Sequence, residues 1–89
     1  MINFKGKKIL ITGATGGIGG ALVKKFVSLE GSVMATGTNT EKLNALKNDF
    51  PNINILKFDI SEHKKIEEFI ENVSSQLTGL DVLVNNAGI

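Results

Sequence analysis

Glycines dominate the first segment whose composition could support chemistry. Residues 12–19 read Thr-Gly-Ala-Thr-Gly-Gly-Ile-Gly and separate a short apolar run from a stretch with helical spacing. Gly13 would permit a tight turn, Gly17 would let backbone approach a pyrophosphate, and Gly19 would let the helix pack closely. Free N–H groups at the helix start would face the phosphates, and Thr15 adds a hydroxyl donor. The segment predicts a dinucleotide site; the alternative is a strand-to-helix turn that binds nothing.

Two shorter polar segments also follow apolar runs. Asp59-Ile60 comes after the third such run, and residues 85–88 (Asn-Asn-Ala-Gly) come after the fourth. Open α/β folds hold their ligands at the carboxyl edge of the sheet, which is where these segments are expected to lie. The alternatives are that Asp59 is a helix-capping or solvated acid before Ser61, and that the asparagines are ordinary turn residues.

The elements that must position these residues alternate along the chain. Strand patterns cover residues 8–12, 32–36, 53–58 and 82–84, and helical patterns cover 17 to about 29, 40 to about 49, and 65–77. Gly31 is expected to stop the first helix. This β-α-β-α-β-α-β order predicts parallel strands joined by right-handed crossovers. The expected fold is α/β, a Rossmann-type doubly wound parallel sheet, of which the chain supplies the N-terminal half.

Apolar spacing also predicts which helix faces are buried. The residues expected to face the sheet are Ile18, Ala21, Leu22, Phe26 and Leu29 in the first helix, Leu43 and Leu46 in the second, and Ile66, Phe69, Ile70, Val73 and Leu77 in the third.

The three polar segments together resemble the short-chain dehydrogenase/reductase family. The glycine spacing Thr-Gly-x-x-x-Gly-x-Gly, the acidic-aliphatic pair Asp59-Ile60 and the Asn-Asn-Ala-Gly segment occur in the family's order. The resemblance implies that the acidic-aliphatic pair receives adenine and that Asn86 helps to position the cofactor. It makes residues 1–89 a partial NAD(P)-binding Rossmann domain, with cofactor contacts from Gly13, Ala14, Thr15, Gly16, Gly17, Ile18, Gly19, Thr38, Asp59, Ile60, Asn86, Ala87 and Gly88.

Within that family, residues 4–7, 11–21 and 37–43 look most like bacterial 3-oxoacyl-[acyl-carrier-protein] reductases. That resemblance implies NADPH-dependent reduction of the 3-oxo group of acyl-carrier-protein thioesters in fatty-acid synthesis, by a homotetramer. Two alternatives remain open. The chain could belong to a family member that acts on another alcohol or ketone, or it could be a non-catalytic nucleotide-binding module.

The choice of nicotinamide cofactor is read after the second predicted strand. An Asp or Glu there would accept from a free ribose 2′-hydroxyl, whereas residues 36–39 are Thr-Gly-Thr-Asn and contain no carboxylate. Asn39 stands where many relatives carry arginine, and Lys42 could reach the ribose only if the second helix began late. The resemblance and the missing acid predict NADP, with NAD not excluded.

The chain contains no tyrosine, although family members transfer a proton through a tyrosine assisted by a lysine four residues later. No catalytic residue is therefore assigned. The catalytic C-terminal half is expected to lie beyond Ile89, and the chain alone is expected to be inactive.

Composition excludes several other classes. Ten basic and nine acidic residues give a net charge of +1 with no block of like charge, which argues against nucleic-acid and membrane surfaces. No cysteine is present, so disulfides and thiolate metal sites are excluded, and no metal site is predicted. His63 is the only histidine and is expected to be solvated. The absence of a signal-like segment makes the cytoplasm the expected location.

Overall fold

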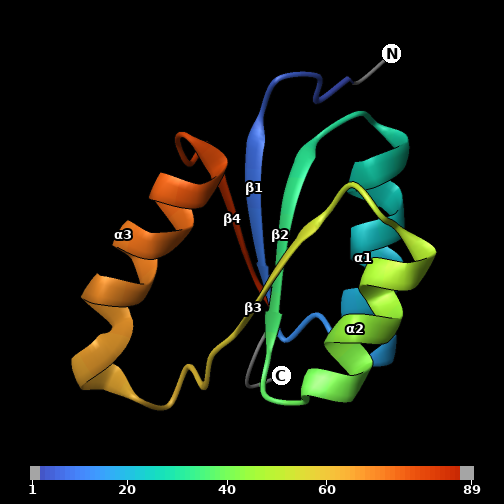
Figure 1. Ribbon diagram of the computed structural model, residues 1–89. Coiled ribbons are helices and arrows are strands. Elements are labelled where there is room, and N and C mark those ends of the chain that lie inside the picture. The colour runs from blue at the N-terminus through green and yellow to red at the C-terminus, as the bar shows by residue number, and fades with distance from the viewer. Residues whose placement is uncertain (1–2, 87–89) are drawn as a thin grey trace.

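The computed structural model describes residues 3–86, which form one four-stranded parallel sheet with helices on both faces (Figure 1). The sheet has the order β3-β2-β1-β4, and every neighbouring pair is parallel. The strands are β1 (Lys8–Thr12), β2 (Ser32–Gly37), β3 (Asn54–Lys57) and β4 (Val82–Asn85). Because parallel strands share one direction, their carboxyl ends meet at a single edge, and all the predicted polar segments follow those ends.

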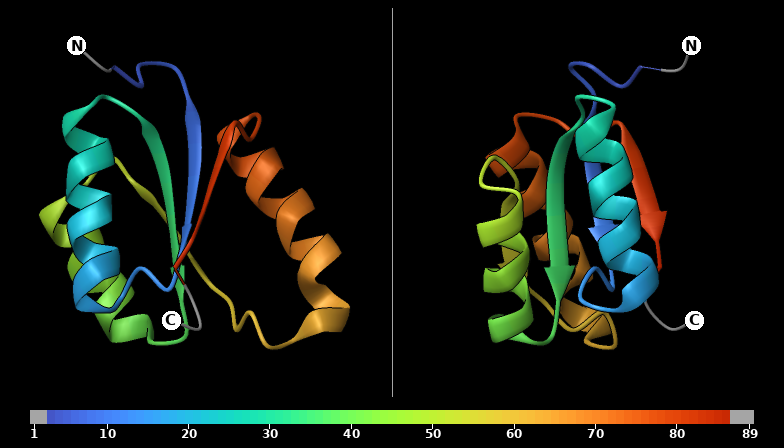
Figure 2. Two further views of the ribbon diagram at one scale, coloured as in Figure 1. Left: turned by 180° about the vertical axis from the view of Figure 1, so that it is seen from behind. Right: turned by 90° about the vertical axis from the view of Figure 1, so that its right-hand side faces the viewer.

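Figure 2 shows α1 (Gly17–Ser28) and α2 (Thr40–Asp49) on one face of the sheet and α3 (Ile66–Leu77) on the other. A short 3-10 turn, η1 (His63–Lys65), leads into α3. The doubly wound α/β fold predicted from the sequence is confirmed. Among the helices of residues 3–86, none has the length and apolar character that crossing a bilayer requires.

Each face of the sheet has its own hydrophobic cluster. Ile9, Ile11, Val33 and Ala35 pack under α1 and α2, whereas the side chains between them in sequence, including Leu10, face α3. A strand covered on both sides needs apolar residues at every position, which explains the unbroken Ile-Leu-Ile run of β1. The burial predicted for α2 and α3 is confirmed, since Leu43, Phe69, Val73 and Leu77 are buried and Leu46, Ile66 and Ile70 are half-buried.

The buried face predicted for α1 is confirmed in part. Leu22 and Phe26 are half-buried and pack against the cluster on this face, and Leu29 is half-buried, whereas the first two predicted residues are not buried. Ile18 is 66% exposed and Ala21 is also exposed, while Gly19 and Val23 are the buried residues of this helix. The cause is Gly19, because a Cβ there would collide with the Gly13 carbonyl oxygen and the Ala14 backbone. That close approach turns the face carrying Gly19 and Val23 toward the sheet, so Ile18 points away from it.

The end of α1 is also built differently. Gly31 follows the end of the helix, as predicted, but the left-handed residue there is Glu30, with a φ of 66°. The Gly31 N–H then donates to the Phe26 carbonyl at 3.0 Å, as in a Schellman cap. Gly31 is needed for space instead, because a Cβ would press into the Ile9 side chain.

The predicted strand and helix boundaries agree closely with the structure. β1 and α2 have the predicted limits, and the third strand is shorter than residues 53–58. Its first predicted residue, Ile53, instead donates its N–H to the Phe50 carbonyl in the turn after α2 (3.1 Å). Beyond the strand, the Phe58 N–H still reaches the Gly37 carbonyl at 3.0 Å, so the pairing of β2 with β3 runs on to the carboxyl edge.

Candidate functional site

The glycine-rich loop turns sharply at the end of β1. Gly13 has a φ of 61°, a left-handed conformation that glycine adopts without steric cost. The Ala14 N–H donates to the Thr36 carbonyl at 2.9 Å and fixes the loop against the end of β2. Gly16, in extended conformation, is the N-cap from which α1 starts at Gly17. The tight turn predicted for Gly13 is confirmed.

The start of α1 leaves backbone donors free beside open space. Apart from its chain neighbours and the backbone of its own helix, no atom of residues 3–86 lies within 4 Å of the position that a Cβ on Gly17 would occupy. The N–H groups of Gly17, Ile18 and Gly19 find no acceptor among residues 3–86. Donors of this kind, at the positive end of a helix dipole, form a cradle for an anion such as a pyrophosphate.

A pocket of about 260 Å³ opens beside this loop at the carboxyl edge of the sheet. It joins three segments that are distant in sequence: the glycine loop, the end of β2 and the residues after β3. Its lining consists of Thr12, Gly13, Thr15, Thr36, Gly37, Thr38, Phe58, Asp59 and Ile60. The structure thus brings the predicted contacts Gly13, Thr15, Thr38, Asp59 and Ile60 together around one hollow. Gly16, Gly17 and Ile18 are exposed and do not line it.

Asp59 has two partners on the same residue. Its Oδ1 accepts from the Ser61 hydroxyl at 2.7 Å and from the Ser61 N–H at 2.9 Å. These bonds, the hydroxyl bond first, lower the pKa of the Asp59 carboxyl, because both favour its charged form. Asp59 is not a helix cap, because η1 starts after Glu62 and α3 after Lys65. Its exposed carboxylate closes a turn onto Ser61 and also lies in the wall of the pocket. An ionised carboxylate held in this way can accept a hydrogen bond from an amino group.

Asn86 ties the end of β4 to the glycine loop. Its Nδ2 donates to the Gly13 carbonyl at 3.0 Å, and its backbone N–H donates to the Thr12 hydroxyl at 3.1 Å. The Thr12 hydroxyl in turn donates to Asn85 Oδ1 at 3.2 Å. Asn86 thus holds the tight turn and does not line the pocket. The predicted contacts Ala87 and Gly88 lie outside the described residues.

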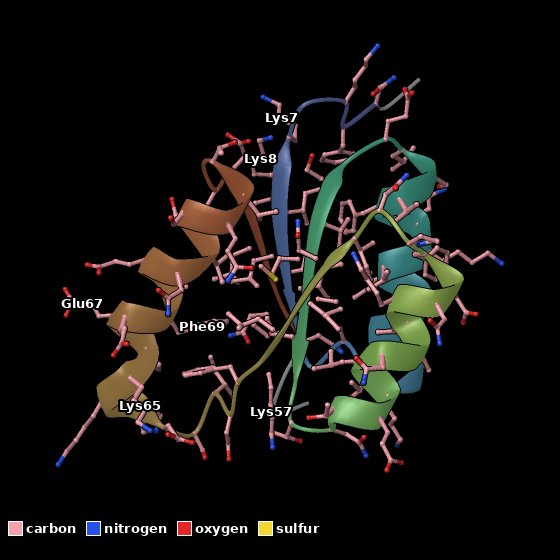
Figure 3. All side chains as sticks on the ribbon, in the orientation of Figure 1. Lys7, Lys8, Lys57, Lys65, Glu67 and Phe69 are labelled. Atoms are coloured by element: carbon pink, nitrogen blue, oxygen red, sulfur yellow. The ribbon has the colours of Figure 1, made fainter. Side chains whose placement is uncertain are left out.

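Four residues that line the pocket are absent from the predicted cofactor contacts, namely Thr12, Thr36, Gly37 and Phe58. A Cβ on Gly37 would come within 2.9 Å of Thr15 Cγ2, so glycine at the end of β2 is what lets Thr15 pack into the pocket wall. Phe58 stacks on Phe69 of α3, with ring centroids 4.0 Å apart and planes 7° apart; Figure 3 shows Phe69 pointing from α3 toward the sheet. Two signals were available, a glycine closing an apolar run and an aromatic residue directly before Asp59.

The end of β2 carries no charge of its own. Asn39 is the N-cap of α2, and its Oδ1 accepts from the Lys42 N–H at 3.0 Å. Because α2 begins at Thr40, the late start that would have let Lys42 reach the ribose does not occur. Thr38 is exposed and lines the pocket. Among residues 3–86, no three His, Asp or Glu side chains cluster in a way that could hold a metal ion.

These features fit a dinucleotide. The free N–H groups of α1 suit its diphosphate, the pocket between β2 and β3 suits an adenosine, and Asp59 suits the adenine amino group. The fit rests on the shape and donors of this site.

Comparison with known proteins agrees with this geometry. A family model described as short chain dehydrogenase matches residues 7–89. The 3-oxoacyl-[acyl-carrier-protein] reductase FabG of Rickettsia bellii is 43% identical over 89 residues, which are 100% of this chain and 36% of that protein. The NADP-dependent 3-hydroxy acid dehydrogenase YdfG of Salmonella typhi is 39% identical over 82 residues, 91% of this chain and 33% of that protein. The chain therefore spans about a third of the length of these relatives.

Solved structures show the same fold. A short chain dehydrogenase from Mycobacterium smegmatis superimposes with a TM-score of 0.89 at 24% identity, covering 99% of this chain and 40% of that one. A short-chain dehydrogenase from Streptomyces avermitilis gives a TM-score of 0.83 at 32% identity, covering 92% of this chain and 31% of that one.

Proposed function

The chain belongs to the short-chain dehydrogenase family, and we propose that it forms the cofactor-binding part of an NADPH-dependent 3-oxoacyl-[acyl-carrier-protein] reductase. The observation that carries the proposal is the 43% identity with a 3-oxoacyl-[acyl-carrier-protein] reductase across all 89 residues. In this proposal residues 1–89 are a partial NAD(P)-binding domain. The reaction is the reduction of the 3-oxo group of an acyl thioester to a hydroxyl.

In this proposal the residues of this chain bind the cofactor and orient it. The N–H groups of Gly17, Ile18 and Gly19 hold the diphosphate, and Asn86 keeps the loop in shape by holding the Gly13 carbonyl. Asp59, kept ionised by Ser61, accepts from the adenine amino group. The nicotinamide ring supplies the hydride when the cofactor is bound.

The preference for NADPH is supported by the uncharged end of β2. Thr38 and Asn39 cannot repel a 2′-phosphate, and neither supplies the carboxylate that would accept from a free ribose 2′-hydroxyl. The dehydrogenase from Salmonella typhi is NADP-dependent by name, which favours the same cofactor. NAD remains the alternative.

The proton of the reaction comes from a residue outside this sequence. The chain has no tyrosine, and no side chain in the pocket is an acid suited to protonate a ketone, because Asp59 is held in its charged form. We therefore assign no catalytic residue within residues 1–89. General acid catalysis commonly contributes about 10²–10⁴-fold to a rate, so the chain alone is expected to bind the cofactor without turning it over.

The substrate carrier, the oligomeric state and the cellular location are parts of the same proposal. The substrate is linked to acyl-carrier protein, the complete enzyme is a homotetramer in fatty-acid synthesis, and the location is the cytoplasm. Each of these rests on the resemblance to 3-oxoacyl reductases and on the cysteine-free, charge-balanced composition.

A second candidate is oxidation of 3-hydroxy acids. The 39% identity with a 3-hydroxy acid dehydrogenase favours it about as strongly over 82 residues. The two reactions share the cofactor site and differ in the substrate pocket, so the residues described here serve both.

A chimera tests the cofactor-binding role that both candidates share. Residues 1–89 are joined to the remainder of the Rickettsia bellii reductase, and NADPH oxidation is followed with acetoacetyl thioester for the chimera and for the 89-residue chain. We expect turnover by the chimera only. A chimera that folds and binds no NADPH would contradict the proposal, as would turnover by the 89 residues alone.

The substrate is identified by assaying the protein encoded by the complete reading frame that contains these 89 residues. Reduction of a 3-oxoacyl thioester supports the first candidate, and oxidation of a free 3-hydroxy acid in its place supports the second.

A further inference from the structure

Lys57 is the last residue of β3 and lies beside the end of β2. Its Cα pairs with that of Gly37 in the parallel register, and strands in a sheet are about 4.8 Å apart. Alternation along the strand places Lys57 on the same face as Ile55, which packs with the cluster under α1 and α2. Figure 3 shows Lys57 at the carboxyl edge of the sheet.

Gly37 separates Lys57 from the glycine loop without filling the space between them. The site of its missing Cβ is taken by the Thr15 side chain, so Thr15, Gly37 and Lys57 lie in a row across three segments. Lys57 and Thr38 also line one open hollow of about 450 Å³, together with Phe58, Asp59, Glu62 and Lys65. The row and this hollow share Lys57, and the hollow adjoins the cofactor pocket through Thr38, Phe58 and Asp59, which line both. The adenosine ribose is expected above Thr38.

The charges in this hollow leave Lys57 available. Lys65 is paired with Glu62 at 3.1 Å, and this is the only ion pair among residues 3–86. Asp59 is held by Ser61 through Oδ1 and forms no ion pair with Lys57. Asn39 is committed to capping α2. Lys57 is exposed and is the cation of the hollow that has no carboxylate partner within the described part of the chain.

We propose that Lys57 selects NADPH over NADH by pairing its ammonium with the 2′-phosphate of the adenosine ribose above Thr38. This inference rests on the proposed cofactor site and adds the charge that the β2 end lacks. A lysine ammonium suits this task because it is a compact charge on a long flexible stem and needs no fixed geometry to meet a phosphate.

The test uses probes that contain only the adenosine end of the cofactor. Adenosine 2′,5′-bisphosphate and adenosine 5′-monophosphate are titrated calorimetrically into the 89-residue chain, Lys57→Gln and Lys57→Arg. The matched control is Lys64→Gln, which removes an exposed lysine from η1 that does not line the hollow. Thermal melts of every variant establish that the folded population is unchanged.

We expect the chain to prefer the bisphosphate and Lys57→Gln to lose about fivefold of its affinity, the scale of one exposed charge pair. The affinity of Lys57→Gln for the monophosphate should equal that of the unmodified chain. Lys57→Arg should keep the preference for the bisphosphate, and Lys64→Gln should change neither affinity. Raising the salt concentration shrinks the preference of the unmodified chain.

Four results would overturn the inference. Either of two results would show that Lys57 does not bind the 2′-phosphate: the bisphosphate binds no better than the monophosphate, or Lys57→Gln keeps the full preference for the bisphosphate. Neither result would contradict the proposed cofactor site. Equal losses in Lys57→Gln and Lys64→Gln would assign the effect to overall charge. If the unmodified chain binds neither probe, the proposed cofactor site itself is wrong and this inference goes with it.

Discussion

Gly17 and Gly20 lie near the start of α1 and differ in one respect that matters for binding. Within the described part of the chain, a Cβ on either would meet no atom within 4 Å beyond its neighbours and its own helix backbone, so both positions have room for a side chain. Only Gly17 faces the loop where the diphosphate is expected. This pair therefore separates the folding requirement for glycine from the binding requirement.

We predict that Gly17→Val loses at least about tenfold in affinity for NADPH, since inserting bulk into a close contact costs about 1–3 kcal/mol. Gly20→Ala should keep its affinity and gain about 1 kcal/mol of stability from the better helix former. Calorimetry and urea unfolding measure the two effects. Equal NADPH affinity in both variants would remove the loop from the site.

The carboxyl of Asp59 gives a prediction for pH. Ser61→Ala removes the hydroxyl that contributes most to lowering the pKa of Asp59, so that pKa should rise toward the ordinary value of about 3.9. Carbon-detected NMR titration of the Asp59 carboxyl measures it. Ser75→Ala, an exposed serine on α3, is the control and should leave the Asp59 titration unchanged.

The sign of the pH dependence follows from linkage. A carboxyl with a lowered pKa stabilises the fold fully above its unfolded pKa and loses that contribution as pH falls through the folded pKa. The turn at Asp59 should therefore weaken only in strong acid, and in Ser61→Ala it should weaken at a higher pH. An unchanged Asp59 pKa in Ser61→Ala would mean that the hydroxyl does not hold the carboxylate.

Residue types at fixed spacing made part of the site predictable. Gly13 and Gly19 are in the roles that the loop pattern indicates, because a left-handed turn and a close backbone contact each tolerate little except glycine. The pairing of Gly37 with Lys57 was not predictable, since it comes from the register of β2 on β3. Register depends on packing across the sheet, which one sequence does not specify.

At the scale of elements, one side chain caps the start of α2. Asn39 Oδ1 accepts from the Lys42 N–H, which satisfies one of the free donors at the helix start. Asn39→Ala should therefore lower the free energy of unfolding by about 1 kcal/mol, while Asn39→Ser keeps the cap. Equal urea midpoints for Asn39→Ala and the unmodified chain would show that the cap contributes nothing.

Asn39→Arg combines two opposed effects at this position. The guanidinium should widen the preference for NADPH by on the order of 1 kcal/mol, the scale of one charge-assisted contact. The lost cap should cost about 1 kcal/mol of stability. Asn48→Arg adds the same charge near the exposed end of α2. It should neither widen the preference for NADPH nor lower the stability. A wider preference in Asn48→Arg would indicate a general charge effect.

Element types and limits were predictable because apolar periodicity is strong here. The stripe of α3, with Phe69, Val73 and Leu77 buried, is the clearest case. For α1 the prediction was right for Leu22 and Phe26 and wrong for Ile18 and Ala21. The closest contact of this helix is made by its smallest residue, Gly19, and hydrophobicity does not mark such a position. A glycine at a close helix-to-strand contact outweighed Ile18 in setting the rotation of the helix.

At the scale of the whole molecule, the site exists because four strand ends meet at one edge. β1 provides the glycine loop, β2 provides Thr38, β3 leads to Asp59, and β4 leads to Asn86, which holds the loop. The alternation of strands and helices predicted the parallel sheet. The order β3-β2-β1-β4, which makes neighbours of β2 and β3 and so forms the pocket, depends on how the helices cover the two faces.

The same order leaves β4 at an edge of the described sheet, and this gives the last prediction. β4 is Val-Leu-Val-Asn, and Leu83 is 54% exposed. An apolar edge strand with unpaired backbone groups is a template for pairing with another chain. We expect the 89-residue chain to associate at high concentration and Leu83→Lys to reduce that association, because a charge on an edge strand opposes pairing.

Asn48→Lys adds the same charge on α2, away from the edge, and should leave the association unchanged. Sedimentation velocity over a concentration series measures the sizes, and NADPH affinity in dilute solution should be equal in all three proteins, since Leu83 lies outside the pocket. Association that Leu83→Lys and Asn48→Lys reduce equally would assign it to net charge, and association unaffected by either would place the contact on another surface.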